Sequence, residues 1–274
     1  MLTIKQTVKS LGLMSVLTAS ALSLSGLAQA GAFDGGIPGT WTCTGNCGTL
    51  GANGVVTTSP EGGNYGWIAS NAAPTGLGLD LDGDGTADGT NGTRLRSGVF
   101  SANAGDDLEF FFNYITSDGA GFADYAWVRL LNSDLSEAAL LFTARTTPGG
   151  DTVPGFGLPP LNPGVTLVPA STPIIAGGPA WSPLGGSSGA CYDTGCGYTD
   201  WIKMTYDIAT DGDYVLEFGV VNWLDTSFDS GLAFDGIQVG GKPIEPEPVP
   251  EPATLALLGL GLAGLGFMRR KPRA

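Results

Sequence analysis

Residues 105–118 read Gly-Asp-Asp-Leu-Glu-Phe-Phe-Phe-Asn-Tyr-Ile-Thr-Ser-Asp, and residues 212–229 read Gly-Asp-Tyr-Val-Leu-Glu-Phe-Gly-Val-Val-Asn-Trp-Leu-Asp-Thr-Ser-Phe-Asp. Each stretch is rich in apolar residues and ends in a polar loop containing aspartate, a pattern typical of a strand followed by a turn. A second strand pattern follows each copy, at 124–129 and 231–237. The second copy has one extra residue before Asn222, which requires a bulge or a register shift. We interpret the pair as two equivalent hairpins whose loops lie at one end of a domain; a chance similarity is the alternative.

The rest of the middle region has the same β character. Between residues 31 and 240, apolar residues recur at period two or in short runs bounded by turn residues, and we find no convincing amphipathic helix. With 45 Gly, 18 Pro and only 14% charged residues, the composition favours short strands joined by turns. The expected fold class is therefore all-β: one antiparallel, jelly-roll-like β-sandwich domain over 31–240. Strands are expected at 55–59, 65–70, 93–100, 107–115, 125–131, 138–144, 164–168, 202–208, 214–223 and 232–239, and the proline-rich stretch 146–183 is expected to form a long loop or insertion across one face.

Composition also restricts the chemistry. The chain has 12 Lys and Arg against 26 Asp and Glu, a net charge of −14, and no His. Without imidazole, a Ser-His-Asp triad, a Cys-His pair and a His-based zinc site are excluded. Basic residues are scarce between the two ends of the chain, so nucleic acid is not an expected partner.

The N-terminus has the pattern of a secretory signal. Lys5 and Lys9 precede an apolar run over 11–27, and Ala28-Gln29-Ala30 follows as a small-residue cleavage site. We expect residues 1–30 to be a signal peptide removed by signal peptidase. A retained signal anchor is the alternative.

The C-terminus has a spacer, an apolar segment and a basic end. Residues 241–252 form a Pro/Glu linker, expected to be extended and self-repelling. Residues 253–268 are apolar and uncharged. As a helix they would cover about 24 Å, slightly less than a hydrocarbon core of about 30 Å, so the helix can just span the membrane if its ends are helped. The basic tail 269–274, with Arg269 and Arg270, would stay in the cytoplasm.

The triplet Pro250-Glu251-Pro252, the apolar helix and the terminal Arg cluster together resemble the PEP-CTERM sorting signal of Gram-negative bacteria. This resemblance implies recognition by an exosortase, cleavage near the triplet, a transient inner-membrane intermediate, and delivery to the cell surface or an exopolysaccharide matrix. An ordinary C-terminal anchor is the alternative. A eukaryotic GPI signal has a similar spacer and tail but lacks the closing Arg cluster.

The body is also similar to a group of PEP-CTERM proteins that carry a single β-sandwich. The similar stretches are 116–129 (Thr-Ser-Asp-Gly-Ala-Gly-Phe-Ala-Asp-Tyr-Ala-Trp-Val-Arg), 141–145 (Leu-Phe-Thr-Ala-Arg) and 229–236 (Asp-Ser-Gly-Leu-Ala-Phe-Asp-Gly). This resemblance implies a fold and a location, and it brings no agreed activity or catalytic residues.

Residues 80–88 read Asp-Leu-Asp-Gly-Asp-Gly-Thr-Ala-Asp and match the front of an EF-hand-like calcium loop, with Asp at positions 1, 3 and 5, Gly at 6 and Asp at 9. Position 12 is Asn91 in place of the bidentate Glu, and no flanking helices are apparent, so a structural Ca²⁺ fits better than a sensor. The alternative is an unliganded acidic turn, in which the carboxylates would repel one another. The candidate ligands are Asp80, Asp82, Asp84, Thr86 and Asp88.

Four cysteines occur as two close pairs, Cys43 with Cys47 and Cys191 with Cys196. An even number in an exported chain favours disulfides. Spacing alone leaves three connectivities open; we favour the two local bridges because each pair encloses a turn containing Gly. A four-thiolate zinc site is the alternative.

Aromatic residues could contact a glycan. Trp127 and Trp223 lie in strand patterns, whereas Trp181 and Trp201 flank the loop 185–199 and are expected to be more exposed. Ligand pockets combine an aromatic floor with a few polar groups, and this loop adds Asp193, Tyr198 and Asp200. The possible glycan contacts are Trp181, Tyr198 and Trp201.

The sequence therefore predicts an exported, non-enzymatic structural or adhesive protein of the cell surface or exopolysaccharide matrix, with Ca²⁺ and extracellular polysaccharide as candidate partners. The first alternative is a carbohydrate-binding module with a defined glycan pocket. The second is a matrix polysaccharide hydrolase, which would need two carboxylates in a cleft. Saturable affinity for one glycan would favour the module, and weak, calcium-dependent association with many polymers would favour the matrix role.

Overall fold

The computed structural model describes residues 31–244. The expected signal peptide, the linker beyond residue 244, the membrane helix and the basic tail lie outside the described residues. Within 31–244, no helix has the length and apolar character needed to cross a bilayer. The sheet continues past residue 240, because Lys242 and Pro243 pair with the preceding strand and Ile244 packs on the core.

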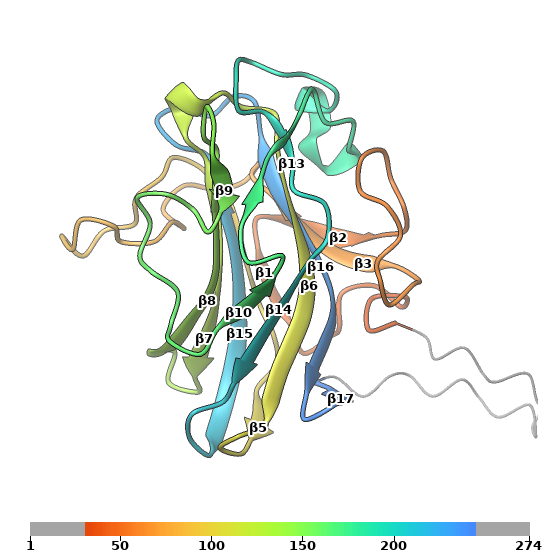
Figure 1. Ribbon diagram of the computed structural model, residues 1–274, viewed down its shortest axis with the longest axis vertical. Coiled ribbons are helices and arrows are strands. Elements are labelled where there is room, and N and C mark those ends of the chain that lie inside the picture. The colour runs from red at the N-terminus through yellow and green to blue at the C-terminus, as the bar shows by residue number, and fades with distance from the viewer. Residues whose placement is uncertain (1–30, 245–274) are drawn as a thin grey trace, which may run out of the picture.

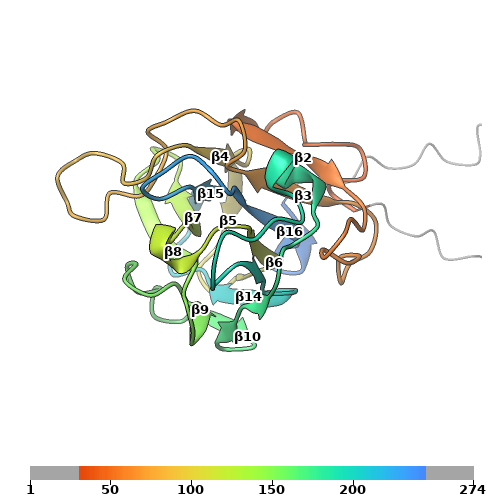
Figure 2. The ribbon, with the colours of Figure 1, turned by 90° about the horizontal axis from the view of Figure 1, so that it is seen from above.

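Two antiparallel sheets pack face to face (Figures 1 and 2), which confirms the expected all-β sandwich. The first sheet contains β1 (Thr42–Thr44), β4 (Gly92–Arg96), β15 (Gly212–Val221), β7 (Tyr125–Asn132) and β8 (Glu137–Arg145) in that order, with β5 (Phe100–Ala102) paired to β15. The second contains β10 (Thr166–Val168), β14 (Ile202–Asp207), β6 (Asp107–Thr116), β16 (Ser230–Val239), β3 (Tyr65–Ala69) and β2 (Asn46–Leu50), with β12 (Ile175–Ala176), β13 (Gly197–Tyr198) and β17 (Lys242–Pro243) off this path. A small ribbon pairs β9 (Asp151–Val153) with β11 (Thr172–Pro173), and two 3₁₀ turns cover Ala120–Phe122 and Ser182–Ser187.

Alternate side chains of the central strands form the core between the sheets. Along β6 these are Leu108, Phe110, Phe112 and Tyr114, and along β15 they are Tyr214, Leu216, Phe218 and Val220, all buried. The ring of Phe218 in the first sheet stacks on that of Phe234 in the second, with centroids 4.1 Å apart. Aromatic contact across the interface adds to the hydrophobic free energy that holds the two layers together.

The two similar stretches do not form hairpins. β6 lies in the second sheet and β7 in the first, while β15 lies in the first sheet and β16 in the second. The connections 117–124 and 222–229 therefore cross between the sheets in opposite directions, and we call them the two arches. They lie at the same end of the sandwich, as expected, because β6 pairs with β16 and β15 pairs with β7.

The extra residue before Asn222 predicts a bulge or a register shift in the second copy, and β15 contains neither. β6 and β15 have the same length, and β15 pairs with β7 without a register shift. Asn222 is therefore the first residue of its arch, whereas Asn113 lies inside β6. Asp124 and Asp229 are the equivalent residues, each preceding the strand that follows its arch.

Several strand bounds differ from expectation. Residues 55–59 form no strand, and Val56 makes only an isolated bridge with Asn53. The strand expected at 93–100 is divided into β4 and β5 because its chain leaves the ladder at 97–99 and then pairs with β15 again. The stretch expected as a loop, 146–183, contributes β9 to β12.

Glu217 organises the outer face of the first sheet. Its carboxylate is fully buried and bonds to Arg96 Nε at 2.8 Å, to Arg129, and to the indole Nε1 of Trp127 at 3.2 Å. Arg94 lies 3.5 Å away. Burial by itself would raise the pKa of Glu217, but the charges of Arg129 and Arg94 hold it below its ordinary value.

Replacing Glu217 tests this network. Glu217→Gln should lower the free energy of unfolding by about 3–5 kcal/mol, because three guanidinium groups lose their shared counter-charge. The control Glu137→Gln removes an exposed partner of Arg129 and should cost no more than about 1 kcal/mol. Urea denaturation measures both, and equal stability of the two variants would contradict this role of Glu217.

A second buried acid predicts a pH dependence. Asp235 on β16 is 1% exposed. Burial raises the pKa of Asp235 to about 6, and the negative charges of Glu61 and Asp34 add to the rise against hydrogen bonds from Ser59 and Gly236. Protonation therefore favours the folded state, and the stability that it contributes is lost as the pH rises from 3.8 through about 6.

Asp235→Asn should remove this part of the pH dependence. Each tenfold change in proton affinity corresponds to about 1.4 kcal/mol, so the variant should gain on the order of 2–3 kcal/mol relative to wild type between the acid and neutral limits. Thermal melts across this range measure the effect, with the exposed Asp151→Asn as a control of equal charge. Parallel stability curves for wild type and Asp235→Asn would contradict the prediction.

Candidate functional site

An acidic loop projects from the connection between β3 and β4 (tan in Figures 1 and 2). Leu79 and Asp88 form an isolated bridge at its base. The hydroxyl of Tyr125 accepts the Leu79 N–H at 2.9 Å and donates to the carbonyl of Asp88, which ties this base to the first sheet. Above this base, carboxylate oxygens of Asp80, Asp82 and Asp88 all lie within 4.8 Å of one another.

Hydrogen bonds inside the loop hold these carboxylates. Asp80 accepts the N–H groups of Gly83 and Gly85 at 2.7 and 3.0 Å, and both glycines have positive φ, which the tight turn requires. Asp84, expected as a ligand, lies outside the close group. Its carboxylate binds Thr86 instead, whose hydroxyl and N–H lower the pKa of Asp84.

Both disulfides have the local connectivity that we favoured. Cys43 bonds to Cys47 in the turn between β1 and β2, and Cys191 bonds to Cys196 in the loop before β13. The zinc alternative does not hold, since all four thiols are used within their own turns.

Of the three residues predicted as possible glycan contacts, Trp181 is buried instead of exposed. Trp181 is 1% exposed and donates its Nε1–H to the hydroxyl of Tyr65 at 3.0 Å. Its ring belongs to an apolar cluster on the outer face of the second sheet. Tyr198 and Trp201 pack against that cluster and remain partly exposed. The ring of Trp201 meets that of Tyr65 edge-on at 5.7 Å.

A second aromatic group, centred on Tyr192, is more exposed than the cluster around Trp181. Tyr192, in the Cys191–Cys196 loop, is 52% exposed and packs between Phe122 and Phe228, with ring centroids 5.4 and 5.0 Å apart. Phe122 and Phe228 belong to the two arches. Sequence reasoning missed this group because its members are far apart along the chain.

The arches also bring buried acids together. Asp118 and Asp124 are fully buried, and Asp229 is 8% exposed. Burial raises the pKa of Asp118 to about 7, and the charges of Asp225 and Asp229 add to the rise. Burial, followed by the charge of Asp118, holds the pKa of Asp124 well above its ordinary value. The similarity of the two stretches was the signal for this cluster, although it did not show that the acids are buried.

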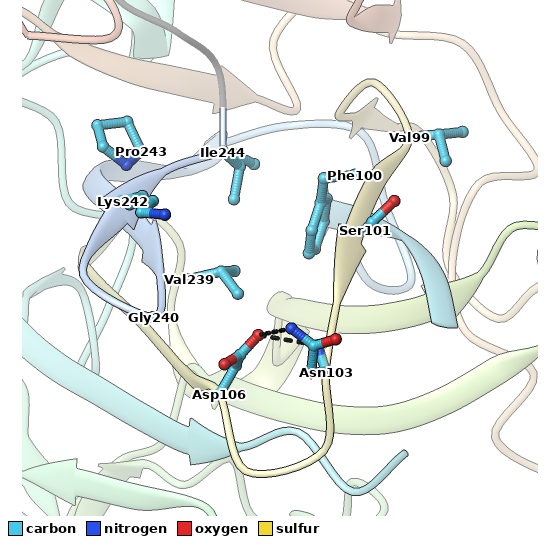
Figure 3. A pocket seen from close by; sticks show the side chains of 10 residues that line it. All are labelled: Val99, Phe100, Ser101, Asn103, Asp106, Val239, Gly240, Lys242, Pro243 and Ile244. Carbon is cyan, nitrogen blue, oxygen red and sulfur yellow. Dashed lines mark hydrogen bonds between the residues drawn. The ribbon is translucent and has the colours of Figure 1, made fainter. Parts of the chain in front are cut away.

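A pocket of about 440 Å³ (Figure 3) lies beside β5 and β17, at the end of the sandwich opposite the arches (Figure 1). Asp106 is the one carboxylate among its lining residues, and it accepts hydrogen bonds from the backbone N–H of Asn103 at 2.8 Å and from its Nδ2 at 3.2 Å. Glycoside hydrolysis by paired carboxylates would require a second acid here. The lining residues are Val99, Phe100, Ser101, Asn103, Asp106, Val239, Gly240, Lys242, Pro243 and Ile244.

The described residues thus define the class of the protein, which is a β-sandwich with an acidic loop and without histidine. Residues 248–271 match the PEP-CTERM protein-sorting motif. The chain is therefore a PEP-CTERM protein, which marks it as exported and as a substrate for exosortase recognition. Comparison with curated proteins gives no match.

Partial matches among solved structures are distant. The K1 cleaved adhesin domain of Lys-gingipain from Porphyromonas gingivalis W83 is 11% identical over 75% of this chain and 93% of that one, with a TM-score of 0.34. A structure of carbohydrate-binding modules from the β-sandwich superfamily is 12% identical over 77% of this chain and 61% of that one, with a TM-score of 0.32. Likenesses this weak support no functional conclusion.

The burial of Trp181 makes a testable distinction. Trp181→Ala should lower the free energy of unfolding by about 3–5 kcal/mol, as expected for a core aromatic residue. Tyr192→Ala should change it by no more than about 1 kcal/mol, because much of this side chain is already in water. Urea denaturation compares the stability of the two variants. A Trp181→Ala variant as stable as wild type would restore Trp181 as a possible glycan contact.

Proposed function

We propose that this exported protein is a non-catalytic structural or adhesive component of the cell surface or exopolysaccharide matrix of a Gram-negative bacterium. In this proposal the acidic loop binds Ca²⁺, and the ion bridges the protein to anionic polysaccharide. Export would pass through signal peptidase, a transient inner-membrane stage and exosortase.

The observation that carries the proposal is the close group of Asp80, Asp82 and Asp88 in a projecting loop with an anchored base. Carboxylate oxygens are the ligands that Ca²⁺ prefers, and Ca²⁺ takes six to eight oxygens in flexible geometry. An exposed loop supplies only part of such a shell. The remaining positions would be open to water or to a carboxylate of the polymer.

Charge supports a cation bridge. Arg94, Arg96 and Arg129 surround Glu217, and Lys203 pairs with Glu109 at 2.6 Å. These cations are engaged by the protein's own acids, so the exterior of the described body is acidic. An acidic body repels an anionic polymer unless a divalent cation intervenes.

A polysaccharide-binding assay tests the proposal. The purified full chain in mild detergent should be retained on immobilised hyaluronan, an acidic polysaccharide, in millimolar calcium and released by EDTA. Asp80→Asn/Asp82→Asn should weaken retention at least about tenfold, because ligand charge sets the affinity of such sites.

The matched control is Asp151→Asn/Asp207→Asn, which removes the same charge from exposed strand residues and should leave calcium-dependent retention intact. Retention that survives EDTA, that is equal in both double variants, or that is absent in calcium would contradict the proposal.

A carbohydrate-binding module is the second candidate, favoured by the partly exposed Trp201 beside Tyr198. It predicts saturable binding to one glycan that persists in EDTA and is lost in Trp201→Ala. That result would replace the calcium-bridged matrix role.

A further inference from the structure

The two arches meet and bring their polar residues into one buried region. The N–H and hydroxyl of Ser117 both donate to the carbonyl of Asp229, at 3.1 and 2.9 Å. Trp223 N–H donates to Asp124 Oδ1 at 2.8 Å, and Ser230 Oγ donates to Asp124 Oδ2 at 2.6 Å. Each arch is thus bonded to the residue that ends the other.

This region contains several buried carboxyl groups. Asp118, Asp124 and Asp229 are buried and Asp225 lies half-buried at the rim. The ion pairs found within residues 31–244 involve none of these four carboxylates. A nearby guanidinium, that of Arg145, directs its Nε–H to the carbonyl of Ala123 and packs its charge over the Trp223 ring. Arg145 forms no salt bridge with these carboxylates, and a buried carboxylate without a bonded counter-charge is costly when it is ionised.

Two oxygens in the same region have no hydrogen-bond donor. They are Oδ2 of Asp118 and Oδ1 of Asn222, and both side chains are fully buried. The other atoms of these groups are held in place: Asp118 Oδ1 accepts the Gly119 N–H at 2.6 Å, and Asn222 Nδ2 lies 3.2 Å from Asn91 Oδ1 and 3.5 Å from Asp229 Oδ1. A buried acceptor without a partner costs about 1–3 kcal/mol. Two such acceptors among carboxylates match the needs of a metal ion, which accepts oxygens and requires no donor.

A disulfide-closed loop covers the region. Tyr192 N–H donates to the carbonyl of Ser117 at 3.0 Å, and Ala120 N–H donates to the carbonyl of Thr194 at 2.9 Å. The Cys191–Cys196 bridge closes this loop, and Tyr192 packs between the rings of the two arches. This loop keeps bulk water from the two unpartnered oxygens of Asp118 and Asn222. It leaves Asp225 at the rim, which is the expected entry for an ion.

We propose that Asp118, Asn222 and Asp229 form a buried binding site for a divalent cation, with Asp225 at its rim. This site is separate from the exposed acidic loop. The all-oxygen donor set, which mixes carboxylates with an amide carbonyl, selects Ca²⁺ over transition metals. A bound ion would offset the buried charge and link both arches beneath the covering loop.

The experiment uses the full chain with the exposed loop silenced by Asp80→Asn/Asp82→Asn. After EDTA treatment and removal of the chelator, CaCl₂ is titrated by calorimetry and thermal melts are recorded with and without calcium. We expect this background variant to bind calcium and to melt at a higher temperature in its presence. Adding Asp118→Asn should abolish both effects, because it removes a carboxylate ligand. Adding Asp225→Asn should weaken binding at least about tenfold, because the rim loses a negative charge that attracts the ion.

The control is Asp193→Asn, an exposed acid in the covering loop, which should leave binding unchanged. A background variant that neither binds calcium nor melts higher with it would overturn the proposal. Equal binding in the presence of Asp118→Asn and Asp225→Asn would do the same. The silenced loop keeps these outcomes separate from the hyaluronan result, which depends on Asp80 and Asp82.

Discussion

The double crossing of the chain between its two sheets is the constraint on which the rest of the structure depends. β6 and β15 are central strands of opposite sheets, and each must place its apolar face toward the other. The strand after each of them lies in the opposite sheet: β7 follows β6 and pairs with β15, and β16 follows β15 and pairs with β6. Two polar connections are brought together at one end as a result, and backbone N–H groups of each arch donate to a backbone carbonyl or a carboxylate of the other.

The two ends of the sandwich differ in character for this reason. The arch end holds buried aspartates, the covering disulfide loop and the exposed aromatic group around Tyr192, and the acidic loop is tied to the same end through Tyr125, the first residue after an arch. The opposite end holds the pocket of Figure 3, with one carboxylate. The proposed cation sites thus both belong to the arch end, where the carboxyl groups without a salt-bridge partner lie.

Local pattern was enough for some features and insufficient for others. Period-two alternation without a helical period predicted the all-β class, and the Gly-containing turn enclosed by each cysteine pair favoured the two local disulfides. A strand, a turn and a strand read the same whether the second strand pairs with the first or crosses to another sheet, so the arches were interpreted as hairpins. Trp181 was expected to be more exposed because it flanks the loop 185–199, but its side chain is buried and bonded to Tyr65. A buried aspartate such as Asp118 cannot be told from a solvated one by sequence, because its burial depends on the other arch and on the covering loop.

The central claim is that the arch end is the cation-binding end of an exported sandwich. Amide hydrogen exchange of the full chain, compared in calcium and in EDTA, tests it most directly. The account predicts that calcium increases protection in 80–88, 117–124, 190–196 and 222–229, and leaves the pocket segments 99–106 and 239–243 unchanged. Identical exchange in the two conditions, or protection confined to the pocket end, would contradict it.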